Sequence, residues 1–295
     1  MKSIRSALLA LVLLLPYAAQ ADVQFGVMAN RGELKAQNQW TPMVQYLSET
    51  IGEPVELVTW PIENTYQTAE AGSVDFIVTN PAQSAALIEV MGFTPLANVK
   101  RAEGASFGGV IIANKKLGLS KGTDLKGRKV MAYNATSAGA YLFQRYHLLQ
   151  QGVDVTKDFA KLAFSKKQDD IVLAVRAGMM DAGFIRTGVL ESMEKDGRIK
   201  ISELSIIDRV DDPNYPLIRS TKLYPSWYLM ARQGVPADMV KKVQEAAFNL
   251  PTSHDAAKKA KIEGFVQPQP VAEMSALMRK LAIPPFDSNK LSSAQ

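Results

Sequence analysis

The chain has 295 residues, no cysteine and a formal net charge of +5. The missing cysteine excludes disulfides, iron–sulfur clusters, Cys-ligated zinc and thiol nucleophiles. Basic and acidic residues are interspersed without a long basic run, which argues against a nucleic-acid partner, and the two histidines, His147 and His254, lack the spacing of a metal site.

Residues 1–21 are typical of a secretory signal peptide. Two basic residues precede an apolar run over 7–15, and the small residues Ala19 and Ala21 form an A-x-A cleavage site. The apolar run is too short to span a membrane as a helix. We therefore expect cleavage after Ala21 and a periplasmic location.

Predicted strands and helices alternate along the rest of the chain, which indicates an α/β protein. Apolar runs predict strands at 23–29, 55–60, 74–79, 128–133, 161–165, 182–186, 201–208 and 220–231. Helical spacing and end signals predict helices at 41–51, 64–72, 80–92, 136–152, 168–178 and after 188. The first of these helices is expected to begin with Thr41 as N-cap and Pro42 at the first helical position.

No Pro- or Ser-rich linker divides the chain into independent domains. The pattern restarts near the middle, which favours two Rossmann-like lobes with a ligand cleft between them. We expect the first lobe to hold residues 22–98 and 209–295, and the second to hold 99–208. Two hinge strands near 97–100 and 204–208 are predicted to join them.

Ligands of open α/β sheets bind beyond the carboxyl ends of the strands, where helices begin. Four such junctions carry hydrogen-bond donors that suit an anion: an arginine fork, hydroxyl groups, or the free N–H groups of a first helical turn. The candidate residues at these junctions are Arg31, Thr79, Asn80, Thr136, Ser137, Gly139, Arg186 and Thr187.

An absence supports the third junction. No Asp or Glu occurs between Asp124 and Asp154, although the first turn of a helix usually favours an acid. An anionic ligand would take that place. Each candidate taken alone also has a structural interpretation, since Asn80 and Thr187 are good N-caps and Arg31 would suit an exposed surface. Only their convergence on one cleft would make a site.

Several segments resemble type II periplasmic binding proteins of the phosphate/phosphite/phosphonate group. The segments are NRGE…WTPMVQYLSETIG, AGSVDFIVTNPAQ, DLKGRKVMAYNATSAGAY, AVRAGMMDAGFIRTGVLESMEKDGRI and LIRSTKLYPSW. They look closest to the sensory domains of tetrathionate-sensor-like histidine kinases. The resemblance implies closure of two lobes on a small oxyanion. By position it adds Gln168 to the site, and it places Ala138 where phosphonate binders carry a hydroxyl.

The expected function is capture of a small oxyanion, phosphonate/phosphate-like or a sulfur oxyanion, for an ABC importer. A ligand-sensing subunit for a separate membrane histidine kinase is the alternative. An enzyme on the same fold and a structural or adhesive protein are the remaining hypotheses. We expect a monomer with no cofactor, no metal and no catalytic residues.

Overall fold

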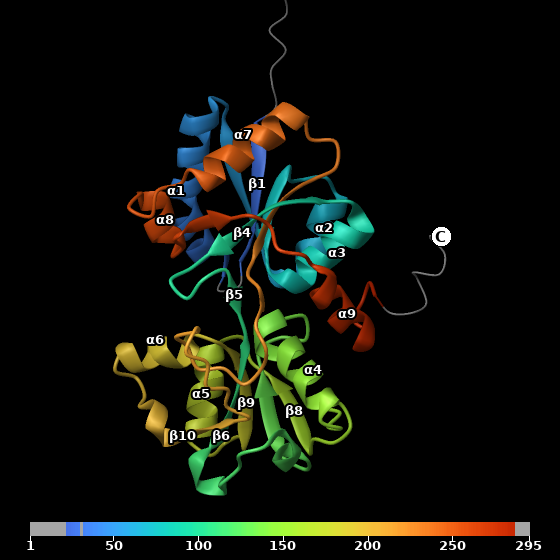
Figure 1. The fold of residues 1–295 in the computed structure, drawn as a ribbon, viewed down its shortest axis with the longest axis vertical. Helices are drawn as coiled ribbons and strands as arrows, with labels where there is room; N and C mark the ends of the chain where they lie inside the picture. Colours follow the sequence, from blue (N-terminus) through green and yellow to red (C-terminus); the bar gives the residue numbers. More distant parts are fainter. Residues whose placement is uncertain (1–21, 30–31, 287–295) are drawn as a thin grey trace, which may run out of the picture.

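Six strands form the sheet of the first lobe, the upper lobe in Figure 1. The computed structural model describes residues 22–29 and 32–286. The strand order is β13 (Gly264–Val266), β4 (Thr94–Lys100), β12 (Tyr228–Ala231), β3 (Phe76–Thr79), β1 (Val23–Met28) and β2 (Val55–Trp60). β1 pairs in parallel with β2 and β3, whereas β12 and β4 return antiparallel.

Helices cover both faces of this sheet. α1 (Glu33–Ile51), α7 (Ala237–Phe248) and α8 (Asp255–Ala260) pack together on one face, and α2 (Thr65–Glu70), α3 (Pro81–Met91) and α9 (Ala272–Lys280) lie on the other (Figure 1). Every residue of β3 is buried, as expected for a strand covered on both sides. This arrangement directs the carboxyl end of β1 toward the second lobe.

The second lobe has a sheet of five strands. Their order is β10 (Leu204–Ile207), β6 (Gly109–Asn114), β9 (Ala182–Arg186), β7 (Lys129–Ala132) and β8 (Lys161–Phe164). α4 (Phe143–Gln150) packs on one face, and α5 (Gln168–Arg176) and α6 (Val189–Lys195) pack on the other. β7 runs parallel to β8 and β9, so their carboxyl ends share one edge, which faces the first lobe (Figure 1).

The two lobes are connected by a short pair of strands. β5 (Ser106–Phe107) and β11 (Tyr224–Pro225) pair antiparallel and belong to neither large sheet. The sequence places the crossings near 97–100 and 204–208, but both segments lie inside the sheets, in β4 and in β10. β5 has only two residues, and β11 is a two-residue part of the longer strand predicted at 220–231, so the sequence pattern does not distinguish either as a crossing.

The start of α1 also differs from the prediction. The helix begins at Glu33, and Pro42 lies inside it. The Thr41 hydroxyl donates to the Gln37 carbonyl at 2.7 Å and caps nothing. The extra turns bury Ala36 and Trp40 against the sheet. Tertiary packing therefore offsets the backbone hydrogen bond that Pro42 cannot make.

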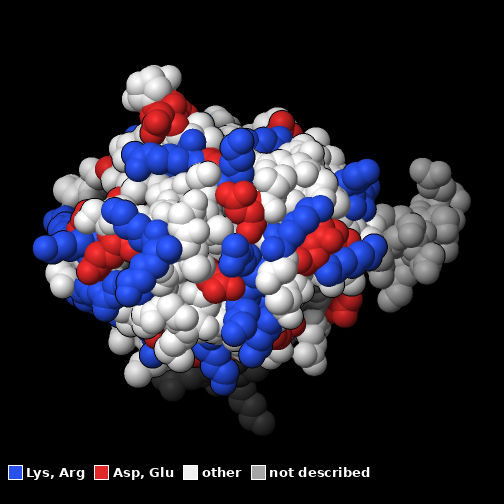
Figure 2. All heavy atoms as spheres, turned by 90° about the horizontal axis from the view of Figure 1, so that it is seen from below, with Lys and Arg blue, Asp and Glu red and all other residues white. Residues whose placement is uncertain are grey.

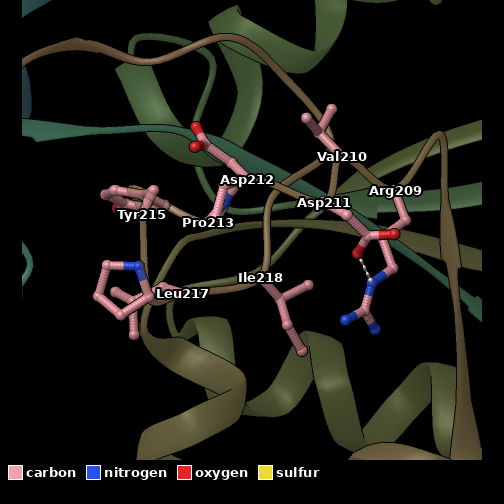
Figure 3. Close-up of a pocket in the computed structure, with 9 residues that line it drawn as sticks. Arg209, Val210, Asp211, Asp212, Pro213, Tyr215, Leu217 and Ile218 are labelled. Carbon is pink, nitrogen blue, oxygen red and sulfur yellow. Dashed lines mark hydrogen bonds and ion pairs between the residues drawn. The ribbon is translucent and has the colours of Figure 1, made fainter.

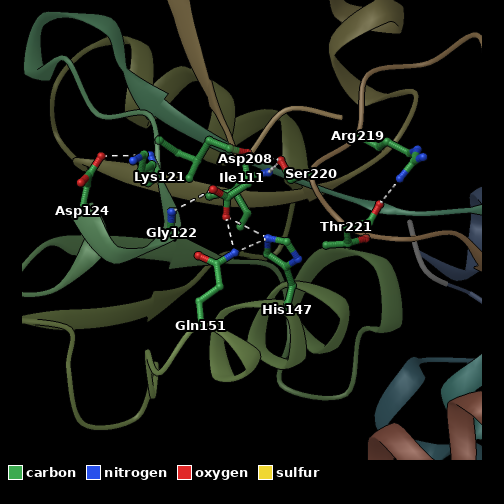
Figure 4. A network of polar contacts seen from close by, with 11 residues as sticks. Ile111, Lys121, Gly122, Asp124, His147, Gln151, Asp208, Arg219, Ser220 and Thr221 are labelled. Carbon is green, nitrogen blue, oxygen red and sulfur yellow. Dashed lines mark hydrogen bonds and ion pairs between the residues drawn. The ribbon is translucent and has the colours of Figure 1, made fainter. Parts of the chain in front are cut away.

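Asp208 anchors the chain as it leaves the second sheet. Its carboxylate accepts hydrogen bonds from the Gly122 N–H at 3.1 Å and the Gln151 amide at 2.7 Å, and it pairs with His147 Nε2 at 2.8 Å (Figure 4). Further along, the Ser220 hydroxyl donates to the Ile207 carbonyl at 2.7 Å. These contacts fasten the returning chain to the second lobe.

We expect Asp208→Ala to lower the free energy of unfolding by about 1.5–3 kcal/mol, because hydrogen bonds to a charged acceptor are lost together. Asp208 also has a φ of 49°, which asparagine tolerates. Asp208→Asn should therefore lose less. Urea unfolding of both variants checks this. Asp211→Ala is the control, because its side chain is 85% exposed; equal losses for Asp208→Ala and Asp211→Ala would contradict the anchoring role.

The predicted signal peptide and the candidate Arg31 lie outside the described residues. Within the part of the chain that is described, no helix combines the length and the apolar character needed to cross a membrane. The same part holds no group of three or more His, Asp or Glu side chains that could bind a metal ion.

Candidate binding cleft between the lobes

A cavity of about 350 Å³ lies between the two lobes. Met28 at the end of β1 and Trp40 of α1 line it from the first lobe. Arg186 at the end of β9 and Gly188 line it from the second lobe. Trp227, which follows the β11 crossing strand, closes a third side. The cavity is therefore built where strands of both sheets end.

Charged side chains of both signs line this cavity. Three are cationic (Arg101, Arg186 and Lys261) and two are acidic (Glu103 and Glu191). An arginine presents a planar fork of donors, which matches the paired oxygens of an oxyanion. A cleft of this kind offers donors to an anionic group and acceptors to donor groups of a ligand.

Arg186 is held in place by two hydrogen bonds, one to Gln168 of the neighbouring helix and one to the adjacent residue Thr187. Its backbone N–H donates to Gln168 Oε1 at 2.9 Å, and its Nη1 donates to the Thr187 carbonyl at 3.1 Å. Gln168 is the first residue of α5. The amide predicted to contact the ligand thus supports the strand end that carries Arg186.

Thr187 is fully buried behind the cavity wall. Its hydroxyl oxygen accepts a hydrogen bond from the Tyr215 hydroxyl at 3.1 Å. Burial raises the pKa of Tyr215 to about 12, so this phenol keeps its proton at neutral pH and remains a donor. The Thr187 hydroxyl therefore fixes the loop over 209–218 against the second lobe.

The loop over 134–139 packs directly beside Arg186. The Asn134 side-chain oxygen accepts from both the N–H and the hydroxyl of Thr136 at 2.8 Å, while its amide donates to Glu63 of the first lobe at 2.9 Å. The Ser137 hydroxyl does not cap the helical turn Ala138–Leu142 that follows it. The loop thus bridges the two lobes, with most of its donors engaged internally.

Gly139 allows this loop to approach Arg186. A Cβ at this position would lie 2.4 Å from Phe107 Cε2 and 3.1 Å from Arg186 Cβ. Phe107 belongs to the β5 crossing strand and lines the cavity. Gly139 is therefore required for close packing between the loop, the crossing strand and the cavity wall.

Thr79 and Asn80 lie beneath the cavity floor. Both are buried, and their side chains contact Met28 Sδ at 3.6 and 3.5 Å. Asn80 also caps α3, accepting from the Ala82 N–H at 2.9 Å, and its amide contacts Gln83. Met28 lines the cavity and Thr79 and Asn80 do not, so both support the Met28 side chain and Asn80 also caps α3.

Arg101, Glu103, Glu191 and Lys261 were not predicted from the sequence as site residues. Arg101 Nη1 donates to the Lys261 carbonyl at 3.0 Å, and its guanidinium lies 5.9 Å from the centroid of the Trp227 ring. Arg101 directly follows β4. The other candidates were predicted because each lies where a strand ends. Arg101 occupies such a position too, so the same criterion identifies it.

Glu191 has one satisfied and one unsatisfied oxygen. One carboxylate oxygen accepts from the Ile218 N–H at 2.7 Å, whereas Oε2 is buried without a hydrogen-bond partner among the described residues. A buried acceptor without a partner costs about 1–3 kcal/mol. Glu191 Oε2 is thus an acceptor in the second-lobe wall that no described protein donor satisfies.

A second cavity, of about 390 Å³, is lined by the loop over 209–218 (Figure 3). Arg209 pairs with Asp211 at 2.9 Å beside it, and Asp212 pairs with Arg219 at 2.8 Å. Leu217 lines both cavities. None of the described residues predicted for the site lines this second cavity.

Two α/β lobes with a charged cavity between them define a periplasmic binding protein fold. Residues 25–272 match the family described as ABC transporter, phosphonate, periplasmic substrate-binding protein. The chain belongs to this family of binding proteins. The resemblance stated from the sequence is thereby confirmed, and so is the two-lobed α/β fold.

Among solved structures, PhnD1 from Prochlorococcus marinus in complex with methylphosphonate has 18% sequence identity and a TM-score of 0.71, with 88% of this chain and 97% of that chain covered. XAC2383 from Xanthomonas citri bound to ATP has 15% identity and a TM-score of 0.74, with 89% and 98% covered. At these identities, the likeness concerns the fold alone.

A curated relative is the tetrathionate sensor histidine kinase TtrS of Salmonella typhimurium. It is 28% identical over 256 residues, which cover 84% of this chain and 43% of the kinase. The chain therefore spans less than half the length of this relative.

Proposed function

We propose that the protein captures a small oxyanion in the periplasm, between its two lobes, and delivers it to an ABC importer. The observation that carries this proposal is the position of Arg186, which ends a strand, is held by Gln168, and lines the inter-lobe cavity. Family membership supports the same function.

A ligand bound in this cavity would exchange water for fixed donors. Each charge-assisted hydrogen bond contributes about 1.5–3 kcal/mol, and exclusion of water strengthens it further. Closure of the lobes would follow because the ligand binds the closed form better than the open form. We infer that the cavity accepts a phosphonate- or phosphate-like ligand or a sulfur oxyanion, since both present oxygens that suit an arginine fork.

Isothermal calorimetry with methylphosphonate, phosphate, sulfate and tetrathionate tests the proposal. The protein should bind at least one of them with roughly micromolar affinity or better. Thermal stabilisation by the same ligand is expected, because the ligand binds only the folded state. A panel in which no anion binds or stabilises the protein would leave a structural or adhesive role.

Tryptophan fluorescence should report closure. Trp40 and Trp227 line the cavity, whereas the third tryptophan, Trp60, is buried and does not line it. Saturation with the ligand found by calorimetry should change the emission, and Trp40→Phe together with Trp227→Phe should remove the change. Trp60→Phe is the control and should preserve it. A flat signal at saturation would contradict movement of the lobes around these two side chains.

The alternative function is ligand sensing for a separate membrane histidine kinase, and the relation to TtrS favours it. Reconstitution separates the two functions. Ligand-loaded protein should stimulate ATP hydrolysis by a permease and ATPase encoded near it, whereas a sensor subunit should change autophosphorylation of a kinase. An enzymatic role would require turnover of a bound oxyanion by the purified protein.

The predicted cleavage after Ala21 is tested by measuring the intact mass of the exported protein.

A further inference from the structure

The end of the second lobe farthest from the cleft carries an excess of positive charge. We define the basal face as residues 115–129, 151–161, 176–181 and 197–203, which form the turns at the bottom of Figure 1. Seen from this end, lysine and arginine predominate over acids (Figure 2). The cationic residues are Lys115, Lys116, Lys121, Lys126, Arg128, Lys129, Lys157, Lys161, Arg176, Arg198 and Lys200.

The five acids of the basal face are engaged within it. Asp158 pairs with Lys126, Asp154 pairs with Lys157, and Glu203 pairs with Arg176, at 3.6, 3.5 and 3.5 Å. The remaining two accept backbone N–H groups: Asp124 those of Ser120 and Lys121, and Asp181 that of Lys129. Lys116 and Lys121 are exposed and make no ion pair with the described residues, so their charges are open to solvent.

Two large apolar side chains are exposed on the same face. Met179 is 74% exposed and Leu117 is 39% exposed. Their turns are fastened together by Asn114, whose side chain accepts from the Lys116 N–H at 3.0 Å and donates to the Val175 carbonyl at 2.8 Å. Exposed apolar side chains among cations are the composition of surfaces that enter a lipid headgroup region.

We propose that the basal face docks on an anionic lipid surface. Each lysine near such a surface contributes about 1 kcal/mol, and Leu117 and Met179 would bury apolar area between the headgroups. Lysine outnumbers arginine on this face, whereas the cores of protein interfaces are enriched in arginine and depleted in lysine. A lipid partner therefore fits better than an acidic protein. Docking would leave the cleft, at the other end of the lobe, open to solvent.

Vesicle co-sedimentation of the exported protein tests the proposal. Binding is expected to vesicles of mixed phosphatidylglycerol and phosphatidylcholine at low salt, to fall as salt rises, and to be absent with phosphatidylcholine alone. Lys116→Gln combined with Lys121→Gln should weaken binding by about tenfold or more. Leu117→Ser combined with Met179→Ser should also weaken it. All variants have the same N-terminus. An uncleaved signal peptide therefore could not explain differences in vesicle binding between them.

The first lobe supplies matched controls. Val90 is 45% exposed on α3, and Lys258 and Lys259 are exposed on α8. Val90→Ser, and Lys258→Gln combined with Lys259→Gln, should leave vesicle binding unchanged. If the Leu117 and Met179 variant is unstable in thermal unfolding, vesicle binding by the Lys116 and Lys121 variant alone tests the proposal. The proposal would be overturned by equal binding to charged and uncharged vesicles, or by no binding to either. It would also be overturned if the protein bound an acidic polypeptide but no vesicles, or if basal-face and control variants had equal effects.

Discussion

Arg186→Ala is expected to weaken oxyanion binding at least about tenfold, which corresponds to about 1.4 kcal/mol. The guanidinium lines the cavity from the end of β9, and no other side chain within one residue of it can replace its fork of donors. Calorimetry should be performed with the tightest ligand of the oxyanion panel, under one buffer and salt condition.

Two further variants define what Arg186 contributes. Arg186→Lys keeps the charge but loses the planar fork, so it should fall between wild type and Arg186→Ala. Arg209→Ala is the matched control, because Arg209 is 54% exposed and lies away from the inter-lobe cavity. An unchanged dissociation constant for Arg186→Ala would remove this residue from the site while leaving family membership intact.

Gly139→Ala is expected to reduce both stability and affinity. The added methyl group would lie 2.4 Å from Phe107 Cε2, closer than any real Cβ contact, so Phe107 or the loop must move. Overpacking of this kind costs about 1–3 kcal/mol. For a protein of this size, the midpoint of thermal unfolding falls by roughly 2–4 °C for each kcal/mol. Affinity should fall too, because the same methyl group would press on Arg186 at 3.1 Å from its Cβ.

Gly122→Ala separates the two effects. A Cβ at Gly122 would lie 2.5 Å from Gln151 Oε1 and 2.6 Å from Leu148 Cδ2, on the basal face. This variant should therefore lower the unfolding midpoint without changing the dissociation constant. If Gly139→Ala retains wild-type values for both, the loop beside Arg186 tolerates displacement and the close approach has no functional role.

The alternation of strands and helices is confirmed because long periodic elements leave a strong pattern. The strands predicted at 55–60 and 182–186 agree with β2 and β9 at both ends. The crossings differ from the predicted ones because β5 and β11 have two residues each, and β11 lies within the longer strand predicted at 220–231, so the sequence singles out neither of them. The predicted helix start at Thr41 and Pro42 is wrong because burial of Trp40 outweighs the backbone hydrogen bond that Pro42 cannot make.

A position at the carboxyl end of a strand is the signal that the sequence offers for a site residue. Arg186 meets that condition and lines the cavity. A hydroxyl or amide at a strand end can instead cap a helix or support a neighbour, as Asn80 and Thr187 do, and residue type alone does not distinguish these uses. Glu191 reaches the cavity from within α6, a placement that depends on how that helix packs.

Because β5 and β11 are hydrogen-bonded to each other, the two chain crossings form one ribbon. The two crossings therefore lie side by side, and we expect a change in the angle between the lobes to bend both of them together. Phe107, carried on that ribbon, touches both the cavity and the space beside Gly139. We therefore expect bending of this ribbon to displace Phe107 and, with it, one side of the cavity.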